Sequence, residues 1–283
     1  MICEVFIINA LSSINKIYSL FNTEALSYTQ EKGYPNMKAN SKKILLWLYP
    51  LAEEKRRVPE QDMEWVVQDL TAAGRRSLVR LLIEEQLIFS DELAGEKHLV
   101  ISSHGQRQLE AEFPFLKFRH ASWQGDWSQI LFLQAPETDK SFRYLRSLLV
   151  KHLAFSLKRG VYMYPGKLPH EVQTVLDQDY RGAVAVVSVV QWEFGDGDII
   201  IGQQAQLQSL IDIYSGISKE IQSLLGVKNR EKRLPKRLKN RLFSLYDRLY
   251  QSVSRDLGII SHYYPQQSDG VAVLNELQIA MSD

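Results

Sequence analysis

The stretch from residue 123 to residue 165 limits the possible folds of this chain more than any other. It begins with Trp123-Gln-Gly125-Asp-Trp127 and continues into the apolar run Ile130-Leu-Phe-Leu133. A short, continuous apolar run of this kind is typical of a buried strand. A helical pattern of Leu and Arg follows Pro136-Glu137, and Gly160-Val-Tyr-Met-Tyr-Pro165 then indicates a second strand. The stretch therefore predicts a strand, a helix and a strand that pack together.

The residues that follow extend this pattern. Residues 169–179 read as a short helix, and residues 182–190 are rich in β-branched side chains, which favours a strand. Residues 198–201 are expected to form a short last strand. With residues 155–157 as a further piece of the second strand, these elements sum to an order that is βαββαβ-like or close to it, as in a ferredoxin-like sandwich. We place this unit at residues 122–202.

The segment from residue 38 to residue 118 has the order of a winged helix-turn-helix. Helical patterns at residues 41–54, 60–70 and 75–85 precede strand patterns at 87–89 and 98–101 and a last helix at 105–112, for which Ser102 or Ser103 is the expected cap. In such a unit the third helix enters the major groove of DNA, and the hairpin lies along the backbone or the minor groove.

The third helix carries the candidate DNA contacts. Arg76 and Arg80 are one turn apart, with Ser77 beside them, on the face expected to meet solvent. A guanidinium donates two parallel hydrogen bonds, which suits guanine edges and phosphates. The predicted DNA-binding residues also include Arg75 on the same helix and Lys97 on the hairpin. The alternative is an ordinary solvated helix face.

Two further features of this segment are expected. The opposite face of the third helix, with Leu78, Leu81, Leu82 and Glu85, is predicted to pack inward. The hairpin carries the acids Asp91, Glu92 and Glu96 against Lys97 and His98. Because acids repel phosphates, the hairpin is expected to add little affinity for DNA.

Residues 203–283 are predicted to be helical throughout. Within them, residues 228–241 hold eight Lys or Arg against one Glu. One interpretation is a surface that binds the phosphates of DNA or of a nucleotide-like effector, with Arg230, Lys232, Arg233, Lys236 and Arg237 as the candidates. The other is a solvated basic junction between helices, interrupted at Pro235.

Charge and cysteine content exclude several classes of function. The formal net charge is +1, so the chain as a whole does not steer toward nucleic acid, and any attraction must come from local patches. The single cysteine, Cys3, excludes an intrachain disulfide framework and a cysteine-based zinc site, and a reducing, cytoplasmic compartment fits.

Residues 1–37 form an N-terminal extension of uncertain status. They are fairly apolar, but they lack the basic start of a signal peptide and the continuous apolar run of a membrane span. A misplaced start and a docking helix are both open interpretations. No membrane partner is expected.

Four motifs together resemble the PaaX-like transcriptional repressors over residues 40–280. They are Trp123-x-Gly-x-Trp127, Leu131-Phe-x-x-x-Pro136-Glu137, Leu145-Arg146 and Gly160-Val-Tyr-x-x-Pro165. That family joins a winged helix, a ferredoxin-like middle related in shape to a CRISPR-associated nuclease, and a helical tail. The resemblance implies a homodimeric repressor of double-stranded DNA that a small effector releases. It also places the family's recognition-helix arginine on Arg76.

The resemblance does not identify the effector, because no position that contacts the effector in that family can be matched in this sequence. In the founding members it is an aryl-acetyl coenzyme A thioester, so an acyl-coenzyme A-like effector is implied by resemblance only. No other cofactor is expected. Trp123 and Trp127 could stack on a ligand, although packing between domains is the favoured interpretation.

A metal-dependent nuclease built on the ferredoxin-like unit is the alternative function. The related nucleases hold a divalent metal with an Asp at the end of the first strand, where this chain has Gln134. A neutral amide is a poor ligand for a hard cation. Glu137 and Asp139 lie at the start of the following helix, where acids favour the helix dipole.

The sequence therefore predicts an α+β protein with a winged helix, a ferredoxin-like domain and a helical C-terminal domain. It predicts no enzyme activity, no catalytic residue and no metal ligand, since the six histidines do not cluster. The expected function is that of a cytoplasmic, DNA-binding transcriptional regulator, an effector-released repressor that acts as a dimer.

Overall fold

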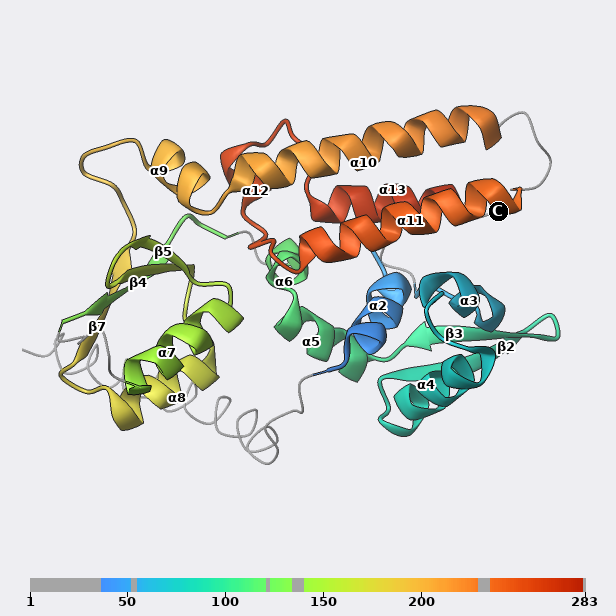
Figure 1. Ribbon diagram of the computed structural model, residues 1–283, viewed down its shortest axis with the longest axis horizontal. Coiled ribbons are helices and arrows are strands. Elements are labelled where there is room, and N and C mark those ends of the chain that lie inside the picture. Colours follow the sequence, from blue (N-terminus) through green and yellow to red (C-terminus); the bar gives the residue numbers. More distant parts are fainter. Residues whose placement is uncertain (1–36, 52–54, 121–122, 134–139, 229–234, 282–283) are drawn as a thin grey trace, which may run out of the picture. The chain divides into compact units, whose positions relative to one another are not determined.

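Two antiparallel sheets and the helices around them give the chain the α+β class that its sequence predicts (Figure 1). The computed structural model describes residues 37–51, 55–120, 123–133, 140–228 and 235–281. Contacts group residues 40–283 into one compact unit. The predicted extension at residues 1–37 lies almost wholly outside the described residues, as does Cys3. The predicted domain boundaries stay predictions.

The first sheet has three strands in the order β1-β3-β2. Its elements are α2 (Ala39–Leu48), β1 (Val58–Pro59), η1 (Glu60–Asp62), α3 (Met63–Val66), α4 (Ala72–Glu84), β2 (Ile88–Leu93), β3 (Glu96–Ile101) and α5 (Ser103–Glu112). Of the two predicted caps, Ser102 is the one that caps α5, because its hydroxyl accepts a hydrogen bond from the Gly105 N–H at 2.9 Å. Three helical segments therefore precede a hairpin and a helix, in the order of a winged helix.

One prediction in this segment is wrong. The helix expected at residues 60–70 is a 3-10 turn followed by a single helical turn, α3, which ends at Val66. Val67 leaves the helical region with φ of −128°. Two consecutive β-branched residues, Val66 and Val67, lose rotamer freedom in a helix, and this lowers the helix propensity at the point where α3 stops.

The second sheet has the order β5-β6-β4-β7, and each neighbouring pair is antiparallel. Its elements are β4 (Trp127–Phe132), α7 (Lys140–Lys151), β5 (Phe155–Lys158), β6 (Val161–Pro165), α8 (His170–Asp179) and β7 (Val184–Val189). This is the predicted βαββαβ order. Its core holds Ile130 and Tyr164 of the sheet against Leu145, Leu149 and Val172 of the helices.

The short last strand expected at residues 198–201 is instead part of a helix, α9 (Gly197–Gln204). The carboxylate of Asp196 accepts a hydrogen bond from the Ile199 N–H at 3.0 Å and caps the helix. An Asp N-cap fixes the first turn of a helix, and here it outweighs the strand propensity of three consecutive isoleucines.

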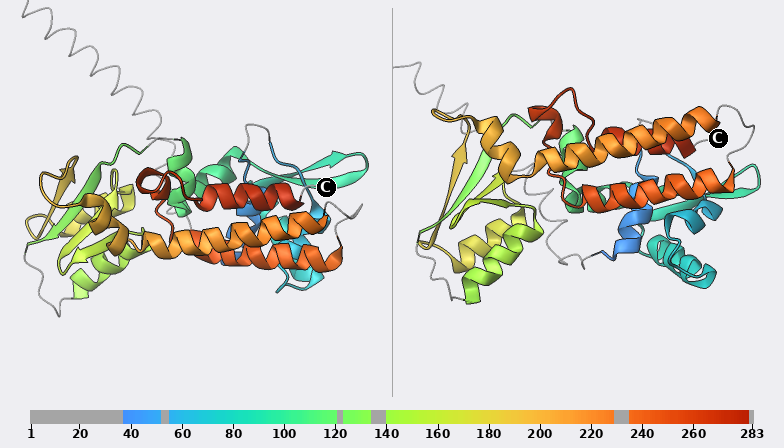
Figure 2. Two further views of the ribbon diagram at one scale, coloured as in Figure 1. Left: turned by 90° about the horizontal axis from the view of Figure 1, so that it is seen from above. Right: turned by 45° about the horizontal axis from the view of Figure 1, so that its top comes forward.

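The remaining helices are α6 (Pro114–His120), α10 (Leu207–Lys228), α11 (Lys236–Val253), α12 (Ile260–Tyr263) and α13 (Gly270–Met281). Helices α10, α11 and α13 pack along one another (Figure 2). The buried side chains of α11 include Leu242, Tyr246, Leu249 and Val253, which are spaced by three or four residues. That spacing forms a single apolar stripe along a helix and accounts for the packing.

Helix α2 is held by α11 and α13, although they lie far from it in sequence. The Trp47 ring lies 5.3 Å from that of Phe243 and 5.0 Å from that of Tyr246, centroid to centroid. The Tyr246 hydroxyl donates to the Lys43 carbonyl at 2.6 Å, and the Gln278 amide donates to the Tyr49 carbonyl at 3.0 Å. Helix α2 therefore shares its core with the C-terminal helices α11 and α13.

The buried carboxylate of Asp256, which follows α11, links that part of the chain to α10. Asp256 is fully buried, and it accepts hydrogen bonds from the Tyr214 hydroxyl at 2.7 Å and from the Gly258 N–H at 2.8 Å. Burial raises the pKa of the Asp256 carboxyl to about 6, and these hydrogen bonds offset only part of that effect.

Asp256→Asn should therefore change how stability depends on pH. The folded state holds the Asp256 proton more tightly than the unfolded chain does. The resulting stabilisation is complete below about pH 4 and is lost as the pH rises through about 6. We expect the unfolding free energy of the native chain, minus that of Asp256→Asn, to fall by about 2 kcal/mol between pH 4 and pH 7.5.

Urea unfolding at the two pH values checks this expectation. Asp177→Asn, which removes an exposed carboxylate, controls for the loss of one charge. A difference between the native chain and Asp256→Asn that stays constant with pH would contradict the assignment.

Candidate nucleic-acid interface

Helix α4 begins at a capped turn and presents one basic face to solvent. The Thr71 hydroxyl accepts a hydrogen bond from the Gly74 N–H at 3.1 Å and so caps the helix. Val79 and Leu82 are buried and fix the inner face. Arg76, Ser77 and Arg80 are all exposed on the outer side, as the sequence predicts. The helix is therefore anchored by its apolar side with these polar groups outward.

Part of the predicted inner face of α4 is wrong. Leu81 is 39% exposed, and Glu85 is an exposed C-cap residue. Because successive helical residues are about 100° apart, Leu81 lies about 130° from the centre of a face formed by Val79 and Leu82, and so falls outside that face. The inner face thus includes fewer residues than the leucine spacing indicates.

The basic side chains of α4 differ in what they contact. Arg75 donates from Nη1 to the Leu70 carbonyl at 2.6 Å, so it stabilises the turn before the helix and is not part of the outer face. Arg80 Nε lies 2.7 Å from the Glu84 carboxylate in an exposed i,i+4 pair. Such pairs contribute little stability, and Arg80 can exchange Glu84 for another anion. Arg76 makes no hydrogen bond or ion pair with any residue that the structure describes.

The hairpin of β2 and β3 is closed by two residues with positive φ, Ala94 at 53° and Gly95 at 81°. This is the backbone of a type I′ turn. Arg57 Nε donates to the Asp91 carboxylate at 2.8 Å, and this hydrogen bond lowers the pKa of Asp91. Arg57 was not predicted as an offset to the acidic hairpin, because it is 34 positions from Asp91 and no local pattern joins the two residues.

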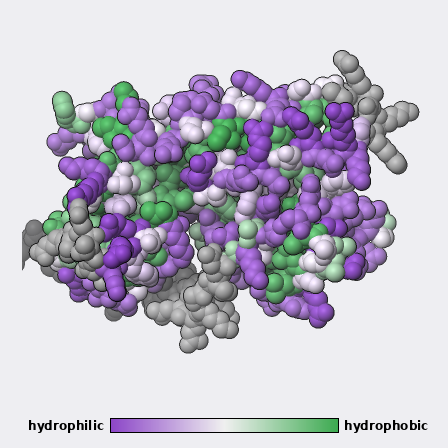
Figure 3. Space-filling model, viewed as in Figure 1, coloured by the Kyte–Doolittle hydropathy of each residue, from purple (hydrophilic) through white to green (hydrophobic). Residues whose placement is uncertain are grey.

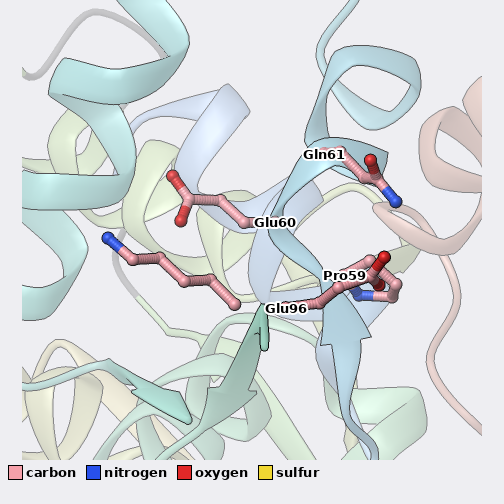
Figure 4. Close-up of a pocket in the computed structure, with 5 residues that line it drawn as sticks. Pro59, Glu60, Gln61 and Glu96 are labelled. Atoms are coloured by element: carbon pink, nitrogen blue, oxygen red, sulfur yellow. The ribbon is translucent and has the colours of Figure 1, made fainter. Parts of the chain in front are cut away.

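Lys97 lies on β3 with its side chain exposed, opposite Glu92 in the β2–β3 register. It also lines a shallow pocket of about 230 Å³ with Pro59, Glu60, Gln61 and Glu96. Glu60 and Gln61 project to opposite sides there (Figure 4). Two carboxylates beside one ammonium group make this pocket a poor site for phosphate. Among the predicted DNA contacts, Lys97 is therefore the weakest.

The predicted phosphate-binding segment is only partly described. Arg230, Lys232 and Arg233 lie outside the described residues. Lys236 and Arg237 are exposed in the first turn of α11. The Lys236 Nζ lies 6.0 Å from the centre of the Trp65 ring, which belongs to α3. Lys236 therefore lies beside α3, the helix that precedes α4.

A third cation of α11 holds this end of the helix in place. Lys239 Nζ lies 2.8 Å from the Asp62 carboxylate and 5.3 Å from the centre of the Trp65 ring. The Trp65 ring in turn stacks on Phe243 at a centroid distance of 6.2 Å. Lys239 was not among the predicted site residues, and 177 positions separate it from Asp62. It fixes α11 to α3, while Lys236 and Arg237 remain outward.

The Trp-x-Gly-x-Trp motif packs against α12. The Trp123 ring lies 4.8 Å from Trp127 and 4.7 Å from His262, and its Nε1 donates to the Asp126 carbonyl at 2.7 Å. Gly125 has φ of +83°, and a Cβ there would come within 3.3 Å of the His262 Nε2. Trp127 is buried. These contacts support the packing interpretation of the two tryptophans over ligand stacking.

The residues weighed for a nuclease lie outside the described part of the chain: Gln134, Glu137 and Asp139. Within the ranges that the structure does describe, no three His, Cys, Asp or Glu side chains are grouped so as to hold a metal ion. None of the described helices has the length and apolar character that a membrane span requires.

Comparisons with known proteins leave the family open. No protein-family model matches the chain, and no curated protein matches it. Among solved structures, the uncharacterized protein Rv0674 from Mycobacterium tuberculosis aligns over 87% of this chain and 100% of its own, with 13% identity and a TM-score of 0.40. A likeness at this level supports no argument about function.

The contact between Gly125 and His262 leads to a test of the packing interpretation. Gly125→Ala should lower the free energy of unfolding by about 1–3 kcal/mol, through backbone strain and through the approach to His262. Gly182→Ala is a matched control, because Gly182 has the same φ of +83° and nothing within 4 Å of its Cβ position. Urea unfolding of both variants separates the two effects.

The difference between Gly125→Ala and Gly182→Ala measures the close approach alone. His262→Ala should recover that difference in the double variant. Equal losses at Gly125 and Gly182, unaffected by His262→Ala, would show that the motif does not depend on this contact.

Proposed function

We propose that this chain is a DNA-binding transcriptional regulator, and specifically a repressor that a small effector releases. The observation that carries the proposal is the outer face of α4. Arg76, Ser77 and Arg80 lie together there, exposed, on the third helix of a winged-helix order of elements. The apolar side of the same helix is buried, so the polar face is presented on a rigid support.

The proposed contact places α4 in the major groove. Arg76, which makes no ion pair among the described residues, supplies a bidentate donor for a guanine edge or a phosphate. Arg80 joins it by exchanging Glu84 for the nucleic acid. Ser77 adds a hydroxyl that can donate to either kind of acceptor.

Phosphate contacts are proposed for the start of α11. The helix before the recognition helix crosses the DNA backbone in units of this kind. Lys236 lies beside α3, which holds that place in the chain order, and Arg237 is the next exposed residue in the first turn of α11. Their charges therefore extend the proposed surface along the DNA backbone, where contacts fix register and add affinity without reading sequence.

The proposed release from DNA depends on an equilibrium between two conformations of the protein, only one of which binds DNA. An effector that binds better to the arrangement unable to hold DNA draws the population toward it. The resemblance to PaaX-like repressors favours an acyl-coenzyme A-like effector and a homodimer that reads two half-sites, and a cytoplasmic protein fits this function. Each of these remains part of the proposal.

Arg76→Ala should weaken binding to preferred DNA by about 1–3 kcal/mol and relax the preference at one base position, because one bidentate contact is removed. The probe is a duplex selected by the native chain from a random-sequence pool. Binding is measured by gel shift at fixed salt. Arg255→Ala is the matched control, since this exposed arginine follows the far end of α11.

Unchanged affinity in Arg76→Ala, with an intact fold by circular dichroism, removes Arg76 from the interface. A native chain that selects no preferred duplex, or that cleaves DNA in the presence of Mg²⁺ or Mn²⁺, contradicts the repressor itself.

The double variant Lys236→Ala/Arg237→Ala should act differently from Arg76→Ala. It should weaken binding to the selected duplex and to an unrelated duplex by the same factor. The slope of log affinity against log salt should fall by about 1 for each phosphate that the variant no longer neutralises. Lys219→Ala/Arg255→Ala removes the same charge from exposed positions elsewhere and should leave the slope unchanged. Equal slopes for the two double variants would exclude the start of α11 from the interface.

A further inference from the structure

Strand β7 lies at an edge of its sheet and lacks the features that usually protect an edge. It pairs with β4 on one side, and no described strand pairs with the other. Its sequence, Val-Ala-Val-Val-Ser-Val, has no charge and no proline. Charged residues, prolines and bulges are the usual means by which edge strands avoid pairing with another chain. Strand β7 is therefore open to such pairing.

The ladder with β4 determines which backbone groups of β7 point outward. The Leu133 N–H donates to the Ala183 carbonyl at 2.9 Å, and these residues continue the register that sets Leu131 opposite Ala185. Bonded and non-bonded pairs alternate in an antiparallel ladder, so Ala185, Val187 and Val189 bond to β4. The N–H and C=O groups of Val186 and Ser188 then point off the sheet edge, and no described backbone group bonds them.

Apolar side chains accompany these outward groups. Val186 is 44% exposed, Val187 41% and Val190 78%, and Phe194 beyond them is almost fully exposed. The molecular face in Figure 3 is mostly hydrophilic, with scattered apolar patches, one of them near α9. A partner at this edge would thus cover apolar side chains as well as backbone groups.

Side chains alternate between faces, so a two-fold axis perpendicular to the sheet must pass through a residue position of β7, and the two registers that overlap the most of this strand are centred on Val186 and Val187. One is centred on Val186 and sets Ser188 against Val184, whose N–H already donates to the Tyr180 carbonyl at 3.1 Å. The other is centred on Val187 and sets Val186 against Ser188 of the second copy. Only the second register bonds every outward N–H and C=O of Val186 and Ser188.

Charge at the two ends of β7 favours the same register. Arg181 precedes the strand and Glu193 follows it, and both are exposed. Arg181 has only a long contact with Asp177, at 3.9 Å. Centring on Val187 brings Arg181 toward Glu193 of the second copy, and the same pair forms again across the axis. This complementarity distinguishes a second copy from an arbitrary strand as the occupant.

We infer that β7 pairs antiparallel with β7 of a second copy, about a two-fold axis at Val187, so that one sheet runs through both copies. The interface is isologous, as closed dimers require. This dimer would provide the second DNA-binding surface that the proposed repressor needs to read two half-sites, and in that respect the inference rests on the proposed function. Its test uses no DNA, so the interface and the proposed function can fail separately.

Cysteine cross-linking of the full chain tests the register. In a Cys3→Ser background, Val187→Cys should form a disulfide with itself under oxidised glutathione, because directly opposed residues of a non-bonded pair bring their Cβ atoms to about 4.5–5.5 Å, close to disulfide range. Ala185→Cys and Val189→Cys should not cross-link alone but should cross-link when mixed, since they oppose each other. A non-reducing gel gives the readout.

A second experiment measures the interface without cross-linking. Val187→Lys sets two ammonium groups face to face at the axis and should raise the dimer dissociation constant at least about tenfold in sedimentation velocity. Val150→Lys is the matched control, since Val150 is an exposed valine of α7. Arg181→Glu and Glu193→Arg should each weaken the dimer, and the double reversal should restore it.

Three results overturn the inference. The first is a chain that stays monomeric at every concentration. The second is a dimer that Val187→Lys leaves unchanged. The third is cross-linking of Ala185→Cys or Val189→Cys with itself while Val187→Cys stays free.

Discussion

The packing of Trp47 against Phe243 and Tyr246 is the contact on which the rest of the structure depends. It joins α2, the first described helix, to α11, near the other end of the chain. The helices that would carry a DNA-binding surface therefore have no complete core of their own. Large aromatic side chains bury much apolar area and hold a defined mutual geometry, so they fix α2 and α3 on α11 more firmly than surface ion pairs do.

Ion pairs, two of them between distant segments and one within α4, neutralise several of the basic side chains. Lys239 forms an ion pair with Asp62, Arg57 with Asp91, and Arg80 with Glu84. A chain with a net charge of +1 can expose a basic surface only where cations are left outside such pairs. Arg76 on α4, together with Lys236 and Arg237 on α11, fits that description among the described residues, and this is why the proposed interface rests on them.

The sequence predicted those parts of the fold that depend on local patterns. The apolar run at residues 130–133, the β-branched run at 182–190 and the Ser102 cap all carry their signal within a few residues, and each lies in the expected element. The strand expected at 198–201 failed because the Asp196 cap overrode the β-branched isoleucines. The exposed face of α4 was predictable from helical spacing. The pairing of Lys239 with Asp62 was not, because only the tertiary fold brings them together.

The hydrogen bonds of the Gln278 amide can form only late in synthesis, after most of the chain has been made. The amide donates to the carbonyls of Trp47 and Tyr49, at the C-terminal end of α2, where a helix leaves carbonyls without partners. Those acceptors are buried with Gln278, which belongs to α13. A ribosome releases α13 after every other described helix, so α2 gains these bonds late in synthesis. A nascent chain thus carries α2, α3 and α4 well before Gln278 can complete the hydrogen bonds at the end of α2.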